Sequence, residues 1–438
     1  MDLKIHEKPE LILQKLIQFN TTNPPGHEKA CIDYIQSLLK DYGIDSFVVA
    51  LDEKRPNLIA RLKGEGKSSP LMMYGHVDVV TTENQKWTNP PFSGDIIDGY
   101  VWGRGALDMK GAVAMMVASF LRAKVEKATL PGDILLVVLS DEENGGNYGA
   151  KYLVEQHRHL FKDVKYALGE FGGFSMELDK KRFYPIMVAE KQMSWIKLTV
   201  RGQGGHGSMP VEEGAMLKLS RLLEKLNKPL PVHVTPVVKE MIKAITKELS
   251  IPKKLLLKQL LNPKRTEKVL NMIGPKGTLF SSLLHHTLSP TVIHASDKVN
   301  VIPSEITVEV DGRILPGHSE AEFAEELKVL IDDEAVEIEI VRSDIVETEV
   351  DMTWFDTLGD ILKESDKKAK PIPFVLPGVT DGRFFASLGI QTYGFTPMNL
   401  PADFNFIQSV HSEDERIPVE CLYFGSEAIY KAIQRIGK

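Results

Sequence analysis

The sequence has little cysteine, no long apolar run and no excess of positive charge. Only two of its 438 residues are cysteines, Cys31 and Cys421, which argues against a disulfide framework and against a thiolate metal site. No segment contains the roughly 18 consecutive apolar residues that a membrane-spanning helix needs, and the first residues lack the apolar stretch of a signal peptide. These absences predict a soluble protein of the reducing cytoplasm.

The charged residues give no indication of a nucleic-acid partner. The chain carries 53 Lys and Arg against 60 Asp and Glu, a net charge of −7, with both signs interspersed. A protein that binds nucleic acid usually concentrates basic residues on one face instead. The shares of apolar residues, 43%, and of charged residues, 26%, are typical of a globular protein, and the length is too great for one compact core. We therefore expect two domains, or one large domain with a big insertion, and neither a nucleic-acid nor a membrane partner.

Strands and helices alternate along the first part of the chain. The run ILLVVL at 134–139 is apolar throughout, which is typical of a strand covered on both faces. Such alternation predicts an α/β domain built on a mostly parallel sheet. The same pattern returns near the C-terminus, so this domain is predicted to consist of residues 1–193 plus 348–438. Its other main elements are predicted strands at 71–74 and 166–168 and a long helix at 110–127.

Residues 194–347 are predicted to form a second, inserted domain. Strands and helices follow one another in the order β-α-β-β-α-β, the split arrangement of ferredoxin-like α+β domains. The segment 229–290, rich in Leu, Lys and Ile, interrupts this order between the first helix and the second strand, and we expect it to form several short helices. The predicted core elements are residues 195–201, 213–226, 291–295, 305–312, 321–332 and 336–341.

Acidic and histidine side chains directly follow three predicted strands of the α/β domain, and one more acid precedes its long helix. In open α/β sheets, ligands bind beyond the carboxyl ends of the strands. Groups that are distant in sequence are therefore expected to meet at one edge of the sheet. They are His76 and Asp78, Glu142 and Glu143, Glu170, and Asp108 before the helix.

The side-chain types in this group suit a zinc site. Imidazole nitrogens and carboxylate oxygens both bind zinc, and cobalt or manganese would accept the same donors. Asp78 lies two positions after His76. If one ring nitrogen of His76 binds a metal, the N–H of the other ring nitrogen is expected to donate to the Asp78 carboxylate. Several carboxylates in one place repel one another, and a pair of divalent cations would relieve that repulsion.

Each motif taken alone also has a purely structural interpretation. A His-x-Asp sequence occurs often by chance, and two adjacent glutamates after a strand usually form a solvated loop. His206 lies among glycines, so it could be an ordinary loop histidine. Arg313 lies on a predicted strand, where an arginine is more often a surface charge. The functional interpretation depends on the combination of motifs.

The motifs, in this order and at these separations, resemble those of the zinc exopeptidase and aminoacylase family. The matching segments are GHVDVV, GRGALDMKG, DEENGG, GGHGSMP, KVNVIPSE, VDGRILPG, VTDGR and HSEDERI, which span the chain from His76 to Ile417. The family includes glutamate carboxypeptidase, aminoacylase, acetylornithine deacetylase, succinyl-diaminopimelate desuccinylase and carboxypeptidase S. The resemblance implies a two-zinc catalytic domain and an inserted lid domain that also forms the interface of a homodimer.

The resemblance also implies roles for the residues of the α/β domain. Asp108 would bridge two zinc ions, with His76 and Glu170 around one ion and Glu143 and His411 around the other. Glu142 would act as the general acid and base and would not bind metal.

Further roles are implied for residues outside this group. His206 would reach into the partner subunit's active site, and Asn300 and Arg313 would hold a substrate carboxylate or the developing oxyanion. Gly378 and Thr380, near Asp381 and Arg383, would either shape a substrate carboxylate pocket or form only a turn.

The expected reaction is hydrolysis of an amide bond next to a free carboxylate, by a carboxypeptidase or dipeptidase or by an N-acyl-amino-acid deacylase. The fork of Arg313 matches a carboxylate in two-point contact. One alternative is an aminopeptidase or tripeptidase that recognises a free amine, and another is a catalytically dead metal-binding dimer. The sequence leaves open the preferred side chain or acyl group, the physiological metal and the role of the segment 229–290.

Overall fold

The computed structural model describes residues 4–346 and 349–435, which fall into two compact units. The first unit comprises Met1–Val188, Val350–Phe374 and Thr380–Lys438, and the second comprises Ala189–Glu349 and Val375–Val379. The first junction thus precedes the expected boundary at 193/194, and the expected boundary at 347/348 lies outside the described residues.

The first unit is built on a nine-stranded sheet with the order β1-β2-β6-β3-β7-β17-β9-β16, in which β8 pairs with β9. The strands are β1 (Ser46–Val49), β2 (Asn57–Leu62), β3 (Leu71–His76), β6 (Ile134–Leu139), β7 (Tyr166–Gly169), β8 (Met176–Leu178), β9 (Lys181–Glu190), β16 (Lys370–Leu376) and β17 (Gln391–Gly394). Central strand β3 runs parallel to β6 and β7, and β7 runs parallel to β17. By contrast, β1/β2, β2/β6 and β17/β9 are antiparallel pairs.

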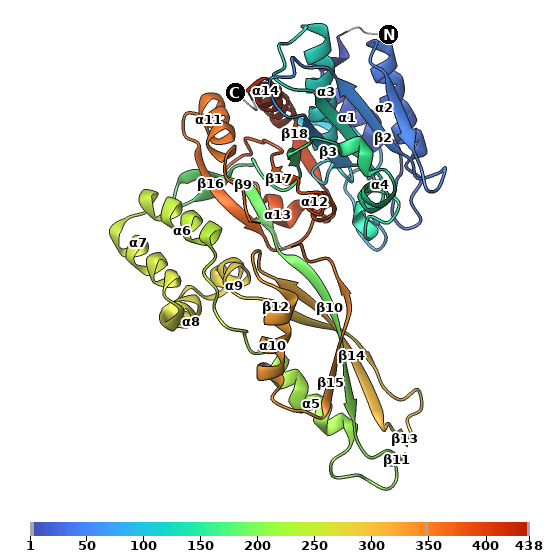
Figure 1. Cartoon of the computed structure of the whole chain (residues 1–438), viewed down its shortest axis with the longest axis vertical. Coiled ribbons are helices and arrows are strands. Elements are labelled where there is room, and N and C mark those ends of the chain that lie inside the picture. Colours follow the sequence, from blue (N-terminus) through green and yellow to red (C-terminus); the bar gives the residue numbers. More distant parts are fainter. Residues whose placement is uncertain (1–3, 347–348, 436–438) are drawn as a thin grey trace. The chain divides into compact units, whose positions relative to one another are not determined.

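This sheet confirms the α/β class, but it is mixed and not mostly parallel as predicted. The helices α3 (Lys110–Val125) and α4 (Ala150–Gln156) supply the long crossovers that parallel neighbours need between β3, β6 and β7. A short turn joins β1 to β2, and only antiparallel neighbours can be joined in this way. Because β3 runs parallel to β6 and β7, the carboxyl ends of these three strands still lie at the same edge of the sheet, whose strands β2, β3, β16 and β17 are labelled in Figure 1.

Helices cover the sheet of the first unit. Almost every residue of α3 is buried, because this helix is apolar all round and packs against β3 and two other helices, α1 (Pro9–Ile17) and α14 (Val419–Arg435). Cys31 and Cys421 are both buried and free. The other α-helices described in this unit are α2 (Lys29–Asp41), α11 (Phe355–Ser365), α12 (Gly382–Ala386) and α13 (Phe406–Ser409). A small separate sheet consists of β4 (Ile96–Ile97), β5 (Tyr100–Trp102) and β18 (Arg416–Pro418).

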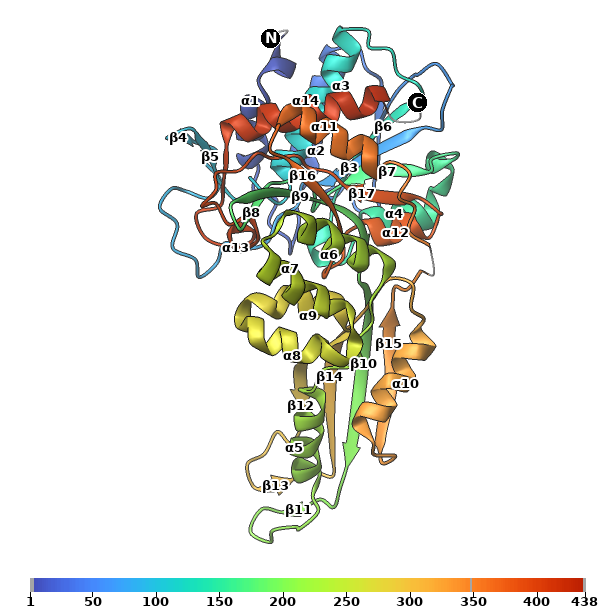
Figure 2. The ribbon, with the colours of Figure 1, turned by 90° about the vertical axis from the view of Figure 1, so that its left-hand side faces the viewer.

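The second unit contains a four-stranded antiparallel sheet with the order β12-β14-β10-β15. Its elements follow one another as β10 (Gln192–Arg201), α5 (Ala215–Leu226), β12 (Thr287–His294), β14 (Glu305–Ile314), α10 (Glu320–Ile331) and β15 (Val336–Ser343), which is the predicted order. Apolar residues of α5 and α10 pack with the sheet in one core (Figure 2). Two short strands, β11 (Gly205–His206) and β13 (Val301–Ile302), pair separately.

The segment between α5 and β12 forms four α-helices in the described residues. They are α6 (Pro236–Glu248), α7 (Ile251–Lys258), α8 (Pro263–Ile273) and α9 (Thr278–Leu284). Prolines open α6 and α8, where the missing N–H costs nothing, and the side chains of Thr235 and Asn262 cap these two helices. Within residues 4–346 and 349–435, none of the helices has the length and apolar character needed to cross a lipid bilayer.

Candidate metal centre

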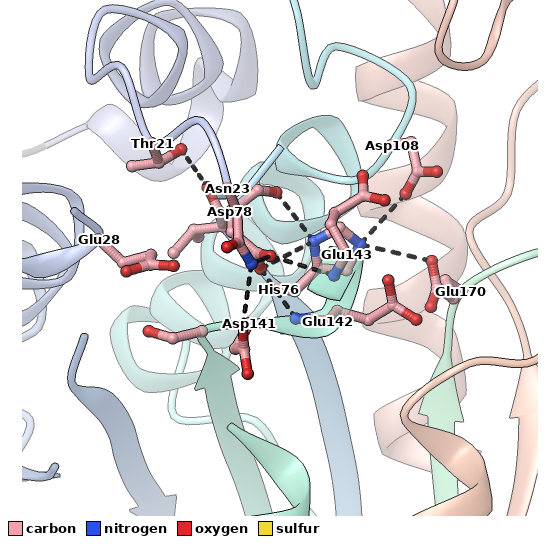
Figure 3. Close-up of polar contacts among 12 residues, drawn as sticks. Thr21, Asn23, Glu28, His76, Asp78, Asp108, Asp141, Glu142, Glu143 and Glu170 are labelled. Atoms are coloured by element: carbon pink, nitrogen blue, oxygen red, sulfur yellow. Dashed lines mark hydrogen bonds and ion pairs between the residues drawn. The ribbon is translucent and has the colours of Figure 1, made fainter. Parts of the chain in front are cut away.

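The side chains that the sequence singled out in the α/β domain come from strand ends and loops of the first unit. His76 ends β3, and Glu170 follows β7. Glu142 and Glu143 begin the short 3-10 helix η2 (Glu142–Asn144), which follows β6. Because β3, β6 and β7 are neighbouring parallel strands, their carboxyl ends bring these residues to the same edge of the sheet (Figure 3).

His76, Asp108 and Glu170 form one group of possible ligands. One donor atom from each lies within 4.8 Å of the others, and all three residues are buried. His76 Nε2 is 3.2 Å from Asp108 Oδ1 and 3.6 Å from Glu170 Oε2. Figure 3 shows Asp108 and Glu170 on the same side of the His76 ring.

Asp108, Glu143 and His411 form a second group, in which one donor atom of each residue again lies within 4.8 Å of the others. His411 Nε2 lies 3.2 Å from Asp108 Oδ2 and 3.2 Å from Glu143 Oε1. Asp108 is thus shared by the two groups, with Oδ1 facing His76 and Oδ2 facing His411. A carboxylate in this position can bridge two neighbouring cations.

The environment of His76 differs in one respect from the expectation. The ring Nδ1–H donates to the backbone carbonyl of Asp78 over 3.0 Å, whereas the Asp78 carboxylate is 3.5 Å from Nδ1. That carboxylate accepts the backbone N–H groups of Glu142 and Glu143, both over 3.1 Å, and an amide N–H of Asn23 over 2.8 Å. Asp78 therefore holds η2 in place, while its main-chain carbonyl binds the Nδ1–H of His76 and so turns Nε2 towards Asp108 and Glu170.

A buried charge network behind Asp78 was not predicted from the sequence. Arg55 pairs with Glu28 over 2.7 Å and with Asp141 over 3.0 Å. Asn23 donates to Asp141 as well as to Asp78, over 3.0 and 2.8 Å, so the network reaches the site. The only sequence signal was that Asp141 directly precedes the two glutamates of η2.

A second unpredicted contact holds the loop that carries Asp108. The buried Glu415 accepts the backbone N–H groups of Leu107 and Asp108 through Oε1, over 2.7 and 3.2 Å. Its Oε2 accepts an N–H of the buried Arg104 over 2.6 Å. Glu415 lies within the HSEDERI motif, which also carries His411. Its role was missed because a charged loop is normally solvated.

Burial and mutual repulsion disturb the protonation of the carboxyl groups in the cluster. Burial raises the pKa of Glu142 well above its usual range, and the nearby Glu170 raises it further. Burial also raises the pKa of Glu170 to about 8 and that of Asp381 to about 7. Positive charge placed among these groups would relieve both effects, so the nitrogen and oxygen donors fit one or two divalent cations.

The pKa values of His411 and Asp108 also shift, each in the direction that favours the charged form of the side chain. Burial alone would lower the pKa of His411, but its contacts with Asp108 and Glu143 raise that pKa to about 10. Burial alone would raise the pKa of Asp108, but hydrogen bonds from His411 and His76 lower it. The central carboxylate therefore stays ionised, as a metal ligand must be.

Three predicted site residues, His206, Asn300 and Arg313, lie in the second unit and make hydrogen bonds with neighbours in that unit. His206 is exposed on β11, and its Nδ1 accepts the backbone N–H of Ser208 over 3.2 Å. Asn300, also exposed, accepts the N–H of Gly207 through its main-chain carbonyl, so the two predicted residues are close neighbours. The fork of Arg313 on β14 is bound by Asp311, over 2.9 and 3.0 Å, and its Nη1 has no hydrogen-bond partner.

Gly378 and Thr380 lie in the loop between β16 and α12. Thr380 is fully buried, and its hydroxyl oxygen accepts the N–H of Gly382 over 2.9 Å, a contact that shapes the turn. Gly378 belongs to the short segment that groups with the second unit. Asp381, next in the chain, is buried, and neither of its carboxylate oxygens has a hydrogen-bond partner.

Comparisons with known proteins agree with the geometry. Residues 72–435 match the sequence profile of peptidase family M20/M25/M40. The chain is 29% identical over 384 residues to a probable carboxypeptidase S-like 2 of Dictyostelium discoideum, covering 83% of this chain and 71% of the relative. It is 25% identical over 421 residues to aminoacylase-1 of Sus scrofa, covering 94% and 91%. A solved M20 family metallo-carboxypeptidase of Sulfolobus solfataricus shares the fold, with a TM-score of 0.69, 16% identity and 99% of each chain covered.

The profile match covers most of the chain and includes every motif on which the predicted resemblance depends. The resemblance to zinc exopeptidases and aminoacylases is therefore confirmed at the level of the family, as is the expectation of an enzyme. The chain belongs to peptidase family M20/M25/M40 and is a hydrolytic enzyme of the metallopeptidase and amidohydrolase type.

Proposed function

We propose that the enzyme holds two divalent cations, zinc by preference, and hydrolyses an amide bond next to a free carboxylate. The single observation that carries this proposal is the position of Asp108, whose two oxygens face His76 and His411. Glu170 would complete the first ligand set and Glu143 the second. Cobalt or manganese would be accepted by the same nitrogen and oxygen donors.

The protein would supply the proton transfers of the reaction through Glu142. When bound, the cations would lower the pKa of a water molecule and polarise the scissile carbonyl. Glu142 belongs to neither group of possible ligands, so its carboxyl is left to take up and to release a proton. It would take a proton from the attacking water and deliver it to the leaving nitrogen. Asp78 would position Glu142 by holding the backbone of η2.

The second unit is proposed to act as a lid and as the interface of a homodimer. Because His206 Nδ1 accepts the N–H of Ser208, the ring proton of neutral His206 lies on Nε2. Such an exposed donor suits a developing oxyanion, and we assign it to the partner subunit's active site. Asn300 would serve the oxyanion or the substrate carboxylate. The free Nη1 of Arg313 would contact the carboxylate, and a two-point contact would require Asp311 to release the fork.

Small dipeptides and N-acyl amino acids are the proposed substrates. The names of the two relatives, a carboxypeptidase and an aminoacylase, support an amide bond beside a carboxylate. Gly378 and Thr380 would contribute to substrate binding by shaping the turn before Asp381.

A substrate panel tests this proposal. Zinc-loaded enzyme is offered N-acetyl amino acids, dipeptides and unblocked tripeptides, each with a free and with an amidated C-terminus. We expect hydrolysis only where the carboxylate is free, and a higher KM in Arg313→Ala. The exposed Arg201 lies on the neighbouring strand β10, so Arg201→Ala is the matched control. Turnover that requires a free amine and ignores amidation of the carboxylate would instead support an aminopeptidase.

A further inference from the structure

Three histidines of the second unit form a cluster that the proposed hydrolysis does not use. His233 lies between α5 and α6, His286 directly before β12, and His318 between β14 and α10. One ring nitrogen of each lies within 4.8 Å of the other two. The three ring centroids are separated by 4.4, 4.7 and 4.9 Å. The folding of this unit thus gathers histidines that are far apart in sequence.

Two glutamates of α10 stand beside these histidines. Glu326 Oε1 lies 2.7 Å from His233 Nε2, and Glu322 Oε2 lies 3.4 Å from His318 Nδ1. In metal sites, a carboxylate that accepts one ring N–H fixes the tautomer and leaves the lone pair of the other nitrogen for the cation. His233 is therefore held with its Nδ1 available, whereas Glu322, whose Oε2 accepts the backbone N–H of Ser319, adds only a nearby negative charge to His318.

His286 supplies the unsatisfied buried atom of the cluster. Its side chain is 0% exposed, and its Nε2 has no hydrogen-bond partner. Glu326 Oε2, 4.0 Å from that nitrogen, also lacks a partner. Buried polar atoms without partners are rare, and a bound ion is one of the few arrangements that explain them.

We propose that His233, His286 and His318 bind one divalent transition-metal cation of the zinc class, separate from the centre in the first unit. Three imidazole nitrogens are a donor set that zinc and its neighbours in the first transition row prefer, and Glu326 offers a nearby carboxylate oxygen. His286, but neither His233 nor His318, lines a cavity of about 560 Å³ in the same unit.

Binding changes one existing contact. The backbone N–H of Leu315 donates to His286 Nδ1 over 3.0 Å, which places the ring proton on Nε2. Coordination through Nε2 shifts this proton to Nδ1 and breaks the bond to Leu315. The buried N–H of Leu315 then has no acceptor, a cost that the binding of the cation by three nitrogen donors must exceed. Without a cation, the same residues form a neutral hydrogen-bonded network, which is the rival interpretation.

Metal counting on the full chain separates these two interpretations. Wild type, His318→Gln, His233→Gln and the control His294→Gln are stripped with a chelator, loaded with Zn²⁺ or Co²⁺, freed of excess ion and measured by mass spectrometry. His294 is a suitable control because it lies on β12, is 66% exposed and also faces a glutamate, Glu309 at 3.5 Å. We expect one cation fewer per chain in His318→Gln and in His233→Gln than in wild type, and no loss in His294→Gln.

Two further readouts keep the result independent of the catalytic centre. Added cation is expected to raise the melting temperature of wild type more than that of His318→Gln, since binding to the folded state alone stabilises it. Hydrolysis of the best substrate is expected to be equal in both, because His318 has no part in the reaction. Equal cation counts in wild type and both cluster variants would overturn the proposal, whether or not the enzyme hydrolyses any substrate in the panel.

Discussion

The carboxylate of Glu415 lies 2.6 Å from the guanidinium of Arg104, and both side chains are buried. Through its other oxygen, the same carboxylate holds the backbone N–H groups of Leu107 and Asp108. The loop that carries the shared ligand therefore depends on a residue 307 positions further along the chain. This relationship links the stability of the first unit to the geometry of its metal centre.

Replacing Glu415 by glutamine is expected to destabilise the protein and to weaken cation binding. The change leaves the buried charge of Arg104 without its partner, which typically costs about 3–5 kcal/mol. Urea unfolding of the stripped and loaded protein measures both effects. The control is Glu427→Gln, because Glu427 pairs with Arg122 at a partly exposed site, where an ion pair is worth about 0–1 kcal/mol. Equal losses in the two variants would contradict this role of Glu415.

Asp78→Asn is expected to lower cation affinity about 10–100-fold while the fold is kept. An amide offers one acceptor oxygen where the carboxylate accepts N–H groups from Glu142, Glu143 and Asn23, so η2 and Glu143 lose their fixed position. Competition against a chromogenic chelator measures the affinity. Asp133→Asn is the control, because Asp133 also accepts a backbone N–H but directly precedes β6, at the other end of that strand from η2. Unchanged affinity in Asp78→Asn would refute the prediction.

Glu142→Gln is expected to retain its cations and to lose hydrolysis by about 10²–10⁴-fold, since the amide cannot carry the proton. Metal content and kcat are measured on the same preparation. Glu155→Gln, an exposed change on α4, is the control and should leave both quantities unchanged. Normal turnover by Glu142→Gln would remove Glu142 from the mechanism.

His206→Ala is expected to be inactive although its cation content is normal, because His206 is proposed to serve the partner subunit's active site. Mixing it with Glu142→Gln should restore activity at one of the two sites of each mixed dimer, because that site has both residues intact. Subunit exchange is verified by mass spectrometry on differently tagged chains. No recovery in verified mixed dimers would show that the site is not shared.

The cation-free protein is expected to lose stability as the pH rises from 4.5 to 8. Burial raises the pKa of Glu170 from 4.5 to about 8, so the folded state binds more protons than the unfolded state in this window. Stability from such a group is present at low pH and disappears as the pH rises through the window. Asp381, with its pKa raised to about 7, acts in the same direction.

Urea unfolding of chelator-treated protein at several pH values within this window measures the effect. Zinc should largely remove it, because the cations replace the protons among the carboxylates. Glu170→Gln should reduce the pH dependence of the cation-free protein. Stability that instead increased with pH would show that the carboxyl pKa values are not raised in the folded state.

The positions of the candidate site residues in the fold were predicted correctly where these residues directly follow a strand. The apolar run at 134–139 identified a buried strand, and Glu142 and Glu143 follow it directly. His76 and Glu170 were located by the same logic at the ends of β3 and β7. The periodicity of a strand does not record the direction of its neighbour, however, so the antiparallel pairing of β2 with β6 was not predicted.

By itself, the sequence determined which segments form buried strands and helices and which side chains can bind a cation, because apolar periodicity and donor chemistry are local properties. Only the tertiary structure decided that Asp108 lies between His76 and His411, that Asp78 binds the backbone of η2, that Glu415 pairs with Arg104 and that three histidines meet in the second unit. The physical reason is that contacts between distant residues depend on how whole elements pack, and no short stretch of sequence carries that information.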